Sequence, residues 1–327
     1  MRSSAGPTLA KSSDWRRDYI EDGDEAVLTQ RSAADDLAAF ESHRALLVAH
    51  AYRMLGDLGR AEDMVQEAWL RWSGRHVDVT SPRAYLVKLV TRLCFNELDS
   101  AKSRHEESRG DRLPEPVDLE DGGIGRVEML DQISMAFLVV LQRLTPAERA
   151  VLLLRDVFEF DYEEIAALVA KSEPACRKLL ERARQNVSAE KRLFSASQEA
   201  HHRLLGAFTQ AASAGDLDAL VAMLAEDAVM ITDGGPEGRR VRGIRNLPRP
   251  LHGARKIAAF VAATTRSTDL QMELHELNGQ PAVVFYQEGA PFAALLLAIA
   301  EDRIHRIFFH GDVARLRYLG PATSSQP

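Results

Sequence analysis

The strongest constraint on the fold is a pair of helix-start signals followed by a basic amphipathic helix, all within residues 145–192. Thr145-Pro146-Ala147-Glu148 combines an N-cap Thr, a Pro at the first helical position and a Glu three residues after the cap. Asp161-Tyr162-Glu163-Glu164 repeats the signal with an acidic cap, and Ser172 caps a third helix. That helix carries one apolar stripe, formed by Cys176, Leu179, Leu180, Ala183 and Val187. This pattern predicts a helix-turn-helix.

Local charge favours contact with DNA. Residues 171–192 contain seven basic and three acidic side chains, a net charge of +4, whereas the whole chain has a net charge of −7. A basic helix on an acidic protein is expected of a DNA reader that does not bind DNA indiscriminately. An ordinary helical hairpin with a solvated basic face is the alternative.

Length and composition predict a soluble cytoplasmic protein of more than one domain. The 327 residues suggest roughly two domains, and the 46% hydrophobic content is enough for buried cores. Cys94 and Cys176 each fall on an apolar helical stripe, so we expect core thiols in a reducing compartment. The N-terminus has no apolar signal segment, and the longest apolar run, residues 290–300, is too short to span a bilayer.

The N-terminal third predicts a helical bundle after a disordered tail at residues 1–35. A helical pattern runs from residue 36 to the turn at Gly56 and Gly59, and a second helix covers residues 60–72. One face of the second helix is polar and acidic, formed by Glu62, Asp63, Gln66 and Glu67. The like charges four residues apart cost an isolated helix a few tenths of a kcal/mol. A basic partner surface and a simple solvated face are both consistent with this pattern.

A third helix is predicted from the Ser81-Pro82 cap to about residue 104. Lys88, Arg92 and Asn96 line up on one of its faces, beside a polar loop. Basic and amide side chains in this arrangement suit phosphates and exposed bases. A solvated stripe is the alternative.

Residues 61–69, Ala-Glu-Asp-Met-Val-Gln-Glu-Ala-Trp, resemble the region 2 signature of the extracytoplasmic-function group of the sigma-70 family, and residues 144–187 are similar to its region 4. The resemblance implies two all-α sigma modules, a region 2 helical bundle at residues 36–104 and a region 4 helix-turn-helix at residues 127–194. It also implies that the partners are core RNA polymerase and promoter DNA. The implied polymerase-binding residues are Glu62, Asp63, Gln66 and Glu67.

The same resemblance assigns DNA-contacting residues to two elements. The third helix and the loop before it would meet the melted minus-ten element, and the basic helix would read the minus-thirty-five element. The implied DNA-binding residues are Arg83, Lys88, Arg92, Asn96, Lys171, Ser172, Arg177, Lys178, Glu181, Arg182 and Arg184. Asn96-Glu97-Leu98-Asp99 departs from the usual Asp-x-Leu-Arg, because two negative charges replace the expected basic ones; this departure leaves open how strongly that end of the helix grips DNA phosphate.

Residues 105–126 read as a flexible acidic linker. Within it, Arg112-Leu113-Pro114-Glu115-Pro116 resembles a Trp-Leu-Pro-Glu-Pro element of one sigma subgroup, in which a C-terminal domain is fused to the sigma modules. Arg112 replaces the Trp.

Residues 199–318 predict an α+β domain followed by a tail at residues 319–327. Helices are expected at residues 202–212, 217–224 and 254–265, and strands at residues 228–232, 270–277, 282–287, 292–300 and 303–310. We expect the strands to form an antiparallel sheet. The order resembles the SnoaL-like, nuclear transport factor 2-like cone, and Asp233-Gly234-Gly235 resembles an Asp-Gly-Gly element of the same subgroup.

We expect these two elements to be regulatory, with Asp233, Gly234 and Gly235 touching Leu113, Pro114, Glu115 and Pro116 so that the cone modulates the sigma modules. Arg239, Arg240 and Arg242 are candidates to meet the linker carboxylates. The free protein is expected to be a monomer.

Two other classes of function remain as alternatives. The cone fold also hosts cyclases and isomerases, and Asp233, His252, His310 and Asp312 are candidates for an acid–base pair. No motif for a metal, nucleotide or other cofactor is present, so we predict no enzyme and no cofactor. The second alternative is a ligand-sensing helix-turn-helix regulator that does not bind polymerase. Such a regulator has no need of the acidic helix at residues 60–72. The sequence identifies no ligand for the cone.

Overall fold

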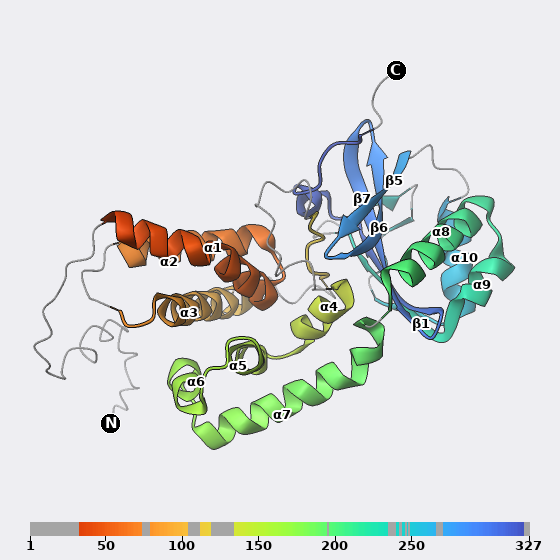
Figure 1. Ribbon diagram of the computed structural model, residues 1–327. Helices are drawn as coiled ribbons and strands as arrows, with labels where there is room; N and C mark the ends of the chain where they lie inside the picture. The colour runs from red at the N-terminus through yellow and green to blue at the C-terminus, as the bar shows by residue number, and fades with distance from the viewer. Residues whose placement is uncertain are drawn as a thin grey trace, which may run out of the picture.

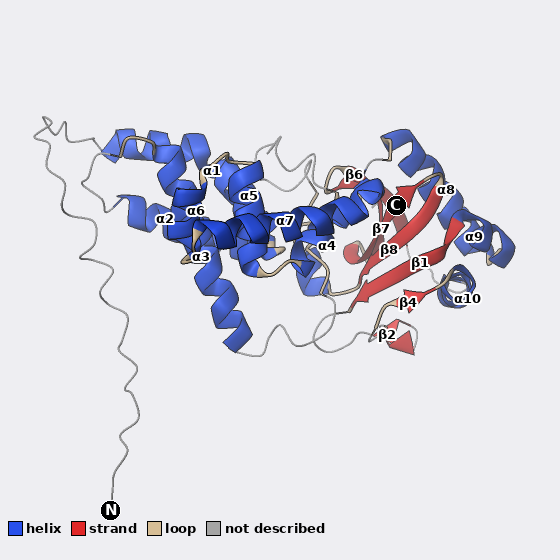
Figure 2. Ribbon diagram, turned by 90° about the horizontal axis from the view of Figure 1, so that it is seen from below, coloured by secondary structure: helices blue, strands red, loops and turns tan. Residues whose placement is uncertain are grey.

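The computed structural model describes residues 33–73, 79–103, 112–118, 134–194, 196–234, 240–241, 244–245, 247, 249–265 and 271–323. They form an N-terminal helical module (α1–α3), a helix-turn-helix module (α4–α7) and a C-terminal cone that begins at α8 (Figure 1). The two helical modules lie side by side, and both approach the same side of the cone (Figures 1 and 2). The tail predicted at residues 1–35 lies outside the described residues except for the start of α1.

The N-terminal helical module contains α1 (Ala33–Leu55), α2 (Leu58–Ser73) and α3 (Pro82–Ser103). Gly56 adopts a left-handed conformation with φ of 69° and reverses the chain between α1 and α2, where the sequence predicts a turn. The three helices enclose fully buried side chains that include Leu47, Tyr52, Leu58 and Leu86. Each helix therefore presents one polar face outward, as its periodicity predicts.

The helix-turn-helix module contains α4 (Met135–Arg143), α5 (Pro146–Asp156), α6 (Tyr162–Val169) and α7 (Glu173–Glu190), followed by the 3₁₀ helix η3 (Lys191–Phe194). Thr145 with Glu148 and Asp161 with Glu164 form the two predicted capping boxes. Ser172 accepts a hydrogen bond from the Ala175 amide and caps α7, as predicted. Ala170, with φ of 51°, ends α6 and sets the turn into α7.

The cone places α8 (Gln198–Ala214), α9 (Leu217–Met223) and α10 (Ala254–Thr265) against a six-stranded sheet of order β4-β1-β8-β7-β6-β5. Its strands are β1 (Leu224–Asp233), β4 (Leu251–His252), β5 (Gln271–Leu277), β6 (Gln280–Gln287), β7 (Ala290–Ala300) and β8 (Arg303–His310). Two short strands outside this sheet, β2 (Arg240–Val241) and β3 (Ile244–Arg245), pair with each other. The expectation of an antiparallel sheet is wrong at one pair, since β1 and β8 run parallel. They can do so because α10 and the β5–β7 meander return the chain to the end of the sheet at which β1 starts.

Both faces of the sheet are covered. Helices α8–α10 cover one face, where Phe208 and Ile257 pack on Leu297 and Ile307. The opposite face carries Ile231, Leu296 and Phe308, and it packs against parts of the chain outside the cone sheet. Those parts are Leu113 before the helix-turn-helix module, Met135 in α4, Leu193 in η3 and Leu316 in the 3₁₀ helix η4 (Val313–Leu316). The sheet thus forms one core with α8–α10 and a second core with the segment around Leu113, the helix-turn-helix module and the C-terminal segment.

Residues 112–118 differ from the flexible linker that composition predicts. They form an extended, mostly buried segment between the N-terminal helical module and the cone. Tyr52 donates a hydrogen bond to the Glu115 carbonyl at 2.6 Å, and the Val117 amide donates to Asn278 Oδ1 at 3.1 Å. The segment is ordered because neighbours on both sides satisfy its backbone groups.

The predicted C-terminal tail also begins later than expected, because Leu319 and Ala322 are buried against the sheet. The Ala322 amide donates to the Gly289 carbonyl at 3.1 Å.

Asn278 provides a stability test of the contact between the cone, residues 112–118 and the N-terminal helical module. It adopts φ of 51° in the β5–β6 turn, and its side chain also donates to the Tyr52 hydroxyl at 2.8 Å. Asn278→Gly keeps the turn conformation and removes both side-chain hydrogen bonds, so we expect a loss of about 2 kcal/mol in the free energy of unfolding. Chemical denaturation of the full-length protein measures this loss. Glu288→Gly, at an exposed turn position with φ of 53°, is the matched control and should cost much less.

Candidate functional site

The acidic face of α2 is accessible at its centre. Asp63 and Gln66 are exposed, whereas Glu62 and Glu67 are half-buried. Glu67 accepts a hydrogen bond from Arg71, one turn further along, at 2.8 Å. Glu62 accepts a hydrogen bond from the hydroxyl of Tyr318 at 3.1 Å. The C-terminal end of the chain therefore covers one end of the face, and the rest is open.

The polar stripe of α3 is partly covered by the helix-turn-helix module. Arg83, Arg92 and Asn96 are exposed. The Lys88 ammonium donates to Glu164 at 2.8 Å and lies 5.3 Å from the centre of the Phe160 ring. The Arg83 guanidinium lies 5.8 Å from the centre of the Phe158 ring. The turn between α5 and α6, together with the start of α6, thus occupies part of the stripe.

The unusual acidic end of α3 has a partial explanation. Glu97 accepts two hydrogen bonds from Arg60 in α2, at 3.1 and 2.6 Å. Asp99 is exposed. Glu97 thus serves packing within the N-terminal helical module.

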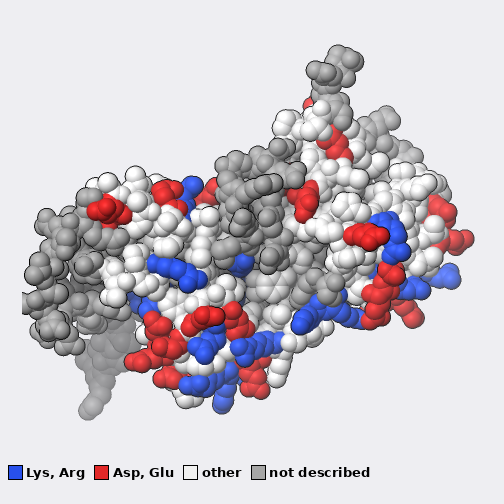
Figure 3. Space-filling model, in the orientation of Figure 1, with Lys and Arg blue, Asp and Glu red and all other residues white. Residues whose placement is uncertain are grey.

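The basic helix α7 presents the predicted side chains to solvent along the lower edge of the molecule, where basic and acidic groups alternate (Figure 3). The exposed residues are Lys171, Ser172, Arg177, Lys178, Glu181, Arg182 and Arg184. Arg177 stacks on the Tyr162 ring at 4.0 Å and pairs with Glu173 at 2.9 Å. Arg184 pairs with Asp156 at 2.6 Å, and this hydrogen bond raises the pKa of the guanidinium. Lys178 and Arg182 make no ion pair with another described residue.

The predicted contact between the Asp-Gly-Gly element and the linker is confirmed at Asp233, whose carboxylate accepts a hydrogen bond from the Leu113 amide at 3.1 Å. Gly235, Arg239, Arg242 and the side chain of Arg240 lie outside the described residues. The linker carboxylate of Glu115 is met by Arg315 and Arg317, each at 3.8 Å.

Three residues near the C-terminus were missed by sequence reasoning. Arg315 lies 3.5 Å from Asp233 and donates to the Gly56 carbonyl at 2.9 Å. Arg317 lies 3.8 Å from Asp57, and Tyr318 binds Glu62. The signal available in the sequence was the basic and aromatic run Arg315-Leu316-Arg317-Tyr318 directly after the last strand. These residues join the cone to the start of α2.

Comparison with known proteins agrees with this architecture. Residues 39–104 match Sigma-70 region 2 and residues 134–187 match Sigma-70, region 4. The chain is 37% identical over 232 residues to the ECF RNA polymerase sigma factor SigJ of Mycobacterium tuberculosis, covering 69% of this chain and 72% of that protein. It is 34% identical over 281 residues to the probable ECF RNA polymerase sigma factor SigI of the same species, covering 83% of this chain and 91% of that protein. The chain belongs to the extracytoplasmic-function sigma factors.

The crystal structure of M. tuberculosis SigJ is similar to this sigma factor with a TM-score of 0.68 and 27% identity, covering 86% of this chain and 98% of that chain. The function of the family is promoter-specific initiation of transcription, and this sigma factor shares it. The predicted fold, two all-α sigma modules followed by an α+β SnoaL-like, nuclear transport factor 2-like cone, is confirmed.

The four candidates for acid–base chemistry are engaged or dispersed in this sigma factor. Asp233 and His310 are neighbours in the β1–β8 register, yet Asp233 holds the linker, and Asp312 caps η4. His252 is exposed at the short strand β4. Burial, reinforced by Arg315, lowers the pKa of His310 to about 3.

Among the described residues, no cluster of His, Cys, Asp and Glu side chains could hold a metal ion. A search of the same residues for a helix able to cross a membrane finds none.

His310 predicts an acid-sensitive step in stability. Its pKa falls from 6.5 to about 3 on folding, so below pH 6.5 the unfolded chain binds a proton that the folded protein does not. Stability is therefore lost as the pH falls, by about 2 kcal/mol at about pH 5. His310→Gln should lose correspondingly less stability between neutral pH and about pH 5 in chemical denaturation. His202→Gln, at an exposed position, should behave as the wild type does; equal acid sensitivity of all three proteins would contradict the assignment.

Proposed function

We propose that this sigma factor binds core RNA polymerase through Glu62, Asp63, Gln66 and Glu67 and contacts promoter DNA through α3 and α7. In this proposal α3 meets the melted minus-ten element with Arg83, Lys88, Arg92 and Asn96, and α7 reads the minus-thirty-five element. The cone holds the two helical modules in a compact state that polymerase must open. One observation carries the proposal. Candidate residues on α2, α3 and α7 are exposed, whereas Lys88 is hydrogen-bonded to Glu164 of the helix-turn-helix module and Glu62 to Tyr318 of the C-terminal segment.

The polymerase-binding role rests on charge and accessibility. Asp63 and Gln66 point to solvent on a helix whose opposite side is buried in the module core. Carboxylates on a rigid helix suit a basic partner surface, which gives orientation and a fast encounter. The bond from Tyr318 to Glu62 places a competitor at the edge of this face.

The DNA-contacting role rests on the exposed cations of α3 and α7. Lys178 and Arg182 are exposed near the middle of α7, whereas Ser172 caps it and Arg177 and Arg184 have partners within the module. Lys178 and Arg182 are therefore the strongest candidates for direct contact with DNA. Arg177 and Arg184 would help to position α7 through their partners within the module.

The modulating role of the cone rests on the polar contacts that join it to the N-terminal helical module, such as the ion pair of Arg317 with Asp57. A partly exposed ion pair of this kind contributes only about 0–1 kcal/mol. Such ties act on modules already held near one another by one chain, where effective concentrations are in the millimolar range for short linkers. Polymerase and DNA can therefore break them without unfolding any module.

The cone is not assigned an enzymatic activity, because its acid–base candidates do not form a site open to substrate. Burial of His310 and the bond of Asp233 to Leu113 support this assignment. We propose no cofactor, a monomer in the free state and action in the cytoplasm, where RNA polymerase works. A ligand-sensing regulator without polymerase delivery is disfavoured by the matches to both sigma regions.

The polymerase face can be tested by charge reversal. Asp63→Arg with Glu67→Arg should weaken binding to core polymerase at least about tenfold while the fold survives, since neither side chain is buried. A binding titration with fluorescent sigma factor measures the affinity, and circular dichroism checks the fold. Glu199→Arg with Glu226→Arg, exposed on the cone, is the matched control. Unchanged affinity of the first variant would remove the assignment.

The compact state can be tested at the tie between α3 and α6. Glu164→Gln keeps an acceptor for the α6 cap but removes the charge that binds Lys88. Because such a pair contributes about 0–1 kcal/mol, affinity for a single-stranded minus-ten oligonucleotide should rise by up to about fivefold in fluorescence anisotropy. Glu148→Gln alters the equivalent capping position of α5, which has no hydrogen bond or ion pair to the described part of α3, and should leave affinity unchanged. Equal affinity of both variants would show that the tie does not limit access to α3.

A further inference from the structure

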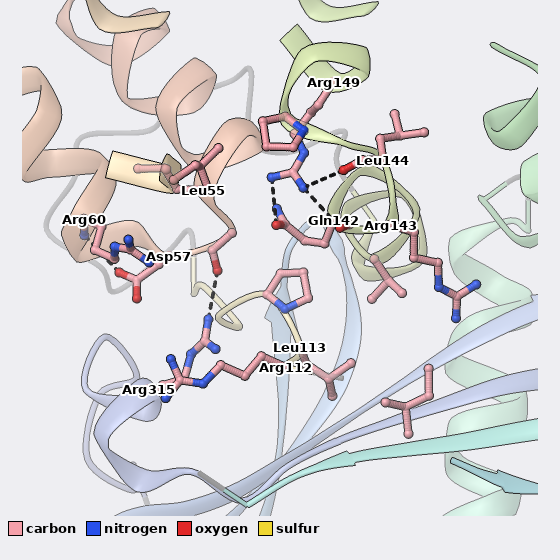
Figure 4. Close-up of a pocket in the computed structure, with 16 residues that line it drawn as sticks. Leu55, Asp57, Arg60, Arg112, Leu113, Gln142, Arg143, Leu144, Arg149 and Arg315 are labelled. Carbon is pink, nitrogen blue, oxygen red and sulfur yellow. Dashed lines mark hydrogen bonds between the residues drawn. The ribbon is translucent and has the colours of Figure 1, made fainter. Parts of the chain in front are cut away.

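A cavity of about 340 Å³ lies where all parts of the molecule meet (Figure 4). Each part contributes apolar lining: Leu98 from the N-terminal helical module, Pro114 from the linker, Val139 from α4 and Ile231 from β1. Such a volume falls in the range of sites for small organic molecules, roughly 300–1,000 Å³.

The polar lining is mainly cationic. Five arginines line the cavity, namely Arg60, Arg112, Arg143, Arg149 and Arg315, and Asp57 is the one carboxylate among the described lining residues. Asp57 is already engaged, since it accepts a hydrogen bond from the Arg60 amide at 2.9 Å and lies 3.8 Å from Arg317. Arg60 and Arg315 are partly neutralised by Glu97 and Glu115. Among the described carboxylates, Arg143 pairs with Glu190 alone, at 4.0 Å.

One lining group, Arg112, has donors that a guest can reach. Arg112 is exposed and makes no hydrogen bond or ion pair with a described residue. The Gln142 amide is oriented by Arg149, which donates to Gln142 Oε1 at 2.8 Å. Its Nε2 has no partner among the described residues, but it is buried beside Gly56 and presents no surface to a guest. Figure 4 shows Arg112 and Arg315 on one side of the cavity, with Gln142 and Arg149 across from them. A guanidinium without a protein partner, in a lining that holds four other arginines, suits an anionic guest.

We propose that the junction cavity binds a small organic anion, with a carboxylate or phosphate head on Arg112 and a flat apolar body against Leu98, Val139 and Ile231. The head provides acceptors for the Arg112 guanidinium. The apolar body replaces water along the remaining walls.

The site has a consequence for regulation that rests on the compact state proposed above. The walls come from both helical modules, the linker and the cone, so separating the modules destroys the site. An anion that binds only the compact state stabilises it and opposes opening by polymerase. Bound anion therefore lowers transcription.

Binding of two anions, AMP and benzoate, to the full-length protein by isothermal titration calorimetry tests the proposal. Adenosine and benzyl alcohol are the matched neutral probes. At least one anion should bind in a one-to-one ratio, its neutral counterpart should not, and Arg112→Gln should weaken binding at least about tenfold. Arg255→Gln, exposed on α10 away from the cavity, should bind as the wild type does.

Promoter-specific transcription with core polymerase provides the second readout. The bound anion should reduce transcription by the wild type but not by Arg112→Gln, which should be active without ligand. No binding of either anion at millimolar concentration, equal binding by Arg112→Gln, or equal binding of the neutral probe overturns the proposal. Binding that leaves transcription unchanged overturns its link to the compact state. If instead the proposed polymerase-binding role is wrong, the Asp63→Arg, Glu67→Arg double variant will bind core polymerase with unchanged affinity, and this result is independent of anion binding.

Discussion

The buried carboxylate of Glu115 sits where the N-terminal helical module meets the cone. Its side chain is 1% exposed and accepts a hydrogen bond from the Leu58 amide at 2.6 Å. Arg315 and Arg317 approach it from the cone, and burial raises the pKa of the carboxyl. A buried charge that loses its partner costs about 3–5 kcal/mol. Neither module alone satisfies this group, so its burial makes the docking of the linker, α2 and the C-terminal segment interdependent.

Sequence reasoning recovered the parts whose signals are local. The capping boxes at Thr145 and Asp161, the Gly56 turn and the bounds of α10 follow from residues a few positions apart. It failed where the cause lies far along the chain. The order of residues 112–118 depends on Tyr52 and Asn278, which composition cannot reveal. Asp233 was placed through the resemblance, whereas Arg315 and Tyr318 had only a weak local signal.

The contacts between modules are of two kinds. Apolar packing stabilises the assembly, whereas partly exposed polar contacts control access to the faces of α2 and α3. The sheet face packs on Leu113, Met135 and Leu193 through apolar side chains that are costly to expose. The two helical modules also share one apolar core, to which Leu86 of α3 and Leu138 of α4 belong. The contacts to the polar faces of α2 and α3, such as Lys88 to Glu164, are single polar contacts at partly exposed sites. A partner that competes for Lys88 or Glu62 meets little resistance there. The apolar seam can persist while those faces are released.

The turn residue Asn278 has a consequence for the protein during its synthesis. It supplies both a side-chain oxygen and an amide to Val117, which precedes it by 161 residues. At about 5–20 residues per second, the ribosome needs about 10–30 s to make the chain between them. In the last part of that interval, once α7 has been made, the emerging polypeptide has complete helices for RNA polymerase and DNA but lacks the hairpin that fastens its linker. The newborn chain thus passes through an unrestrained stage that the finished protein leaves behind.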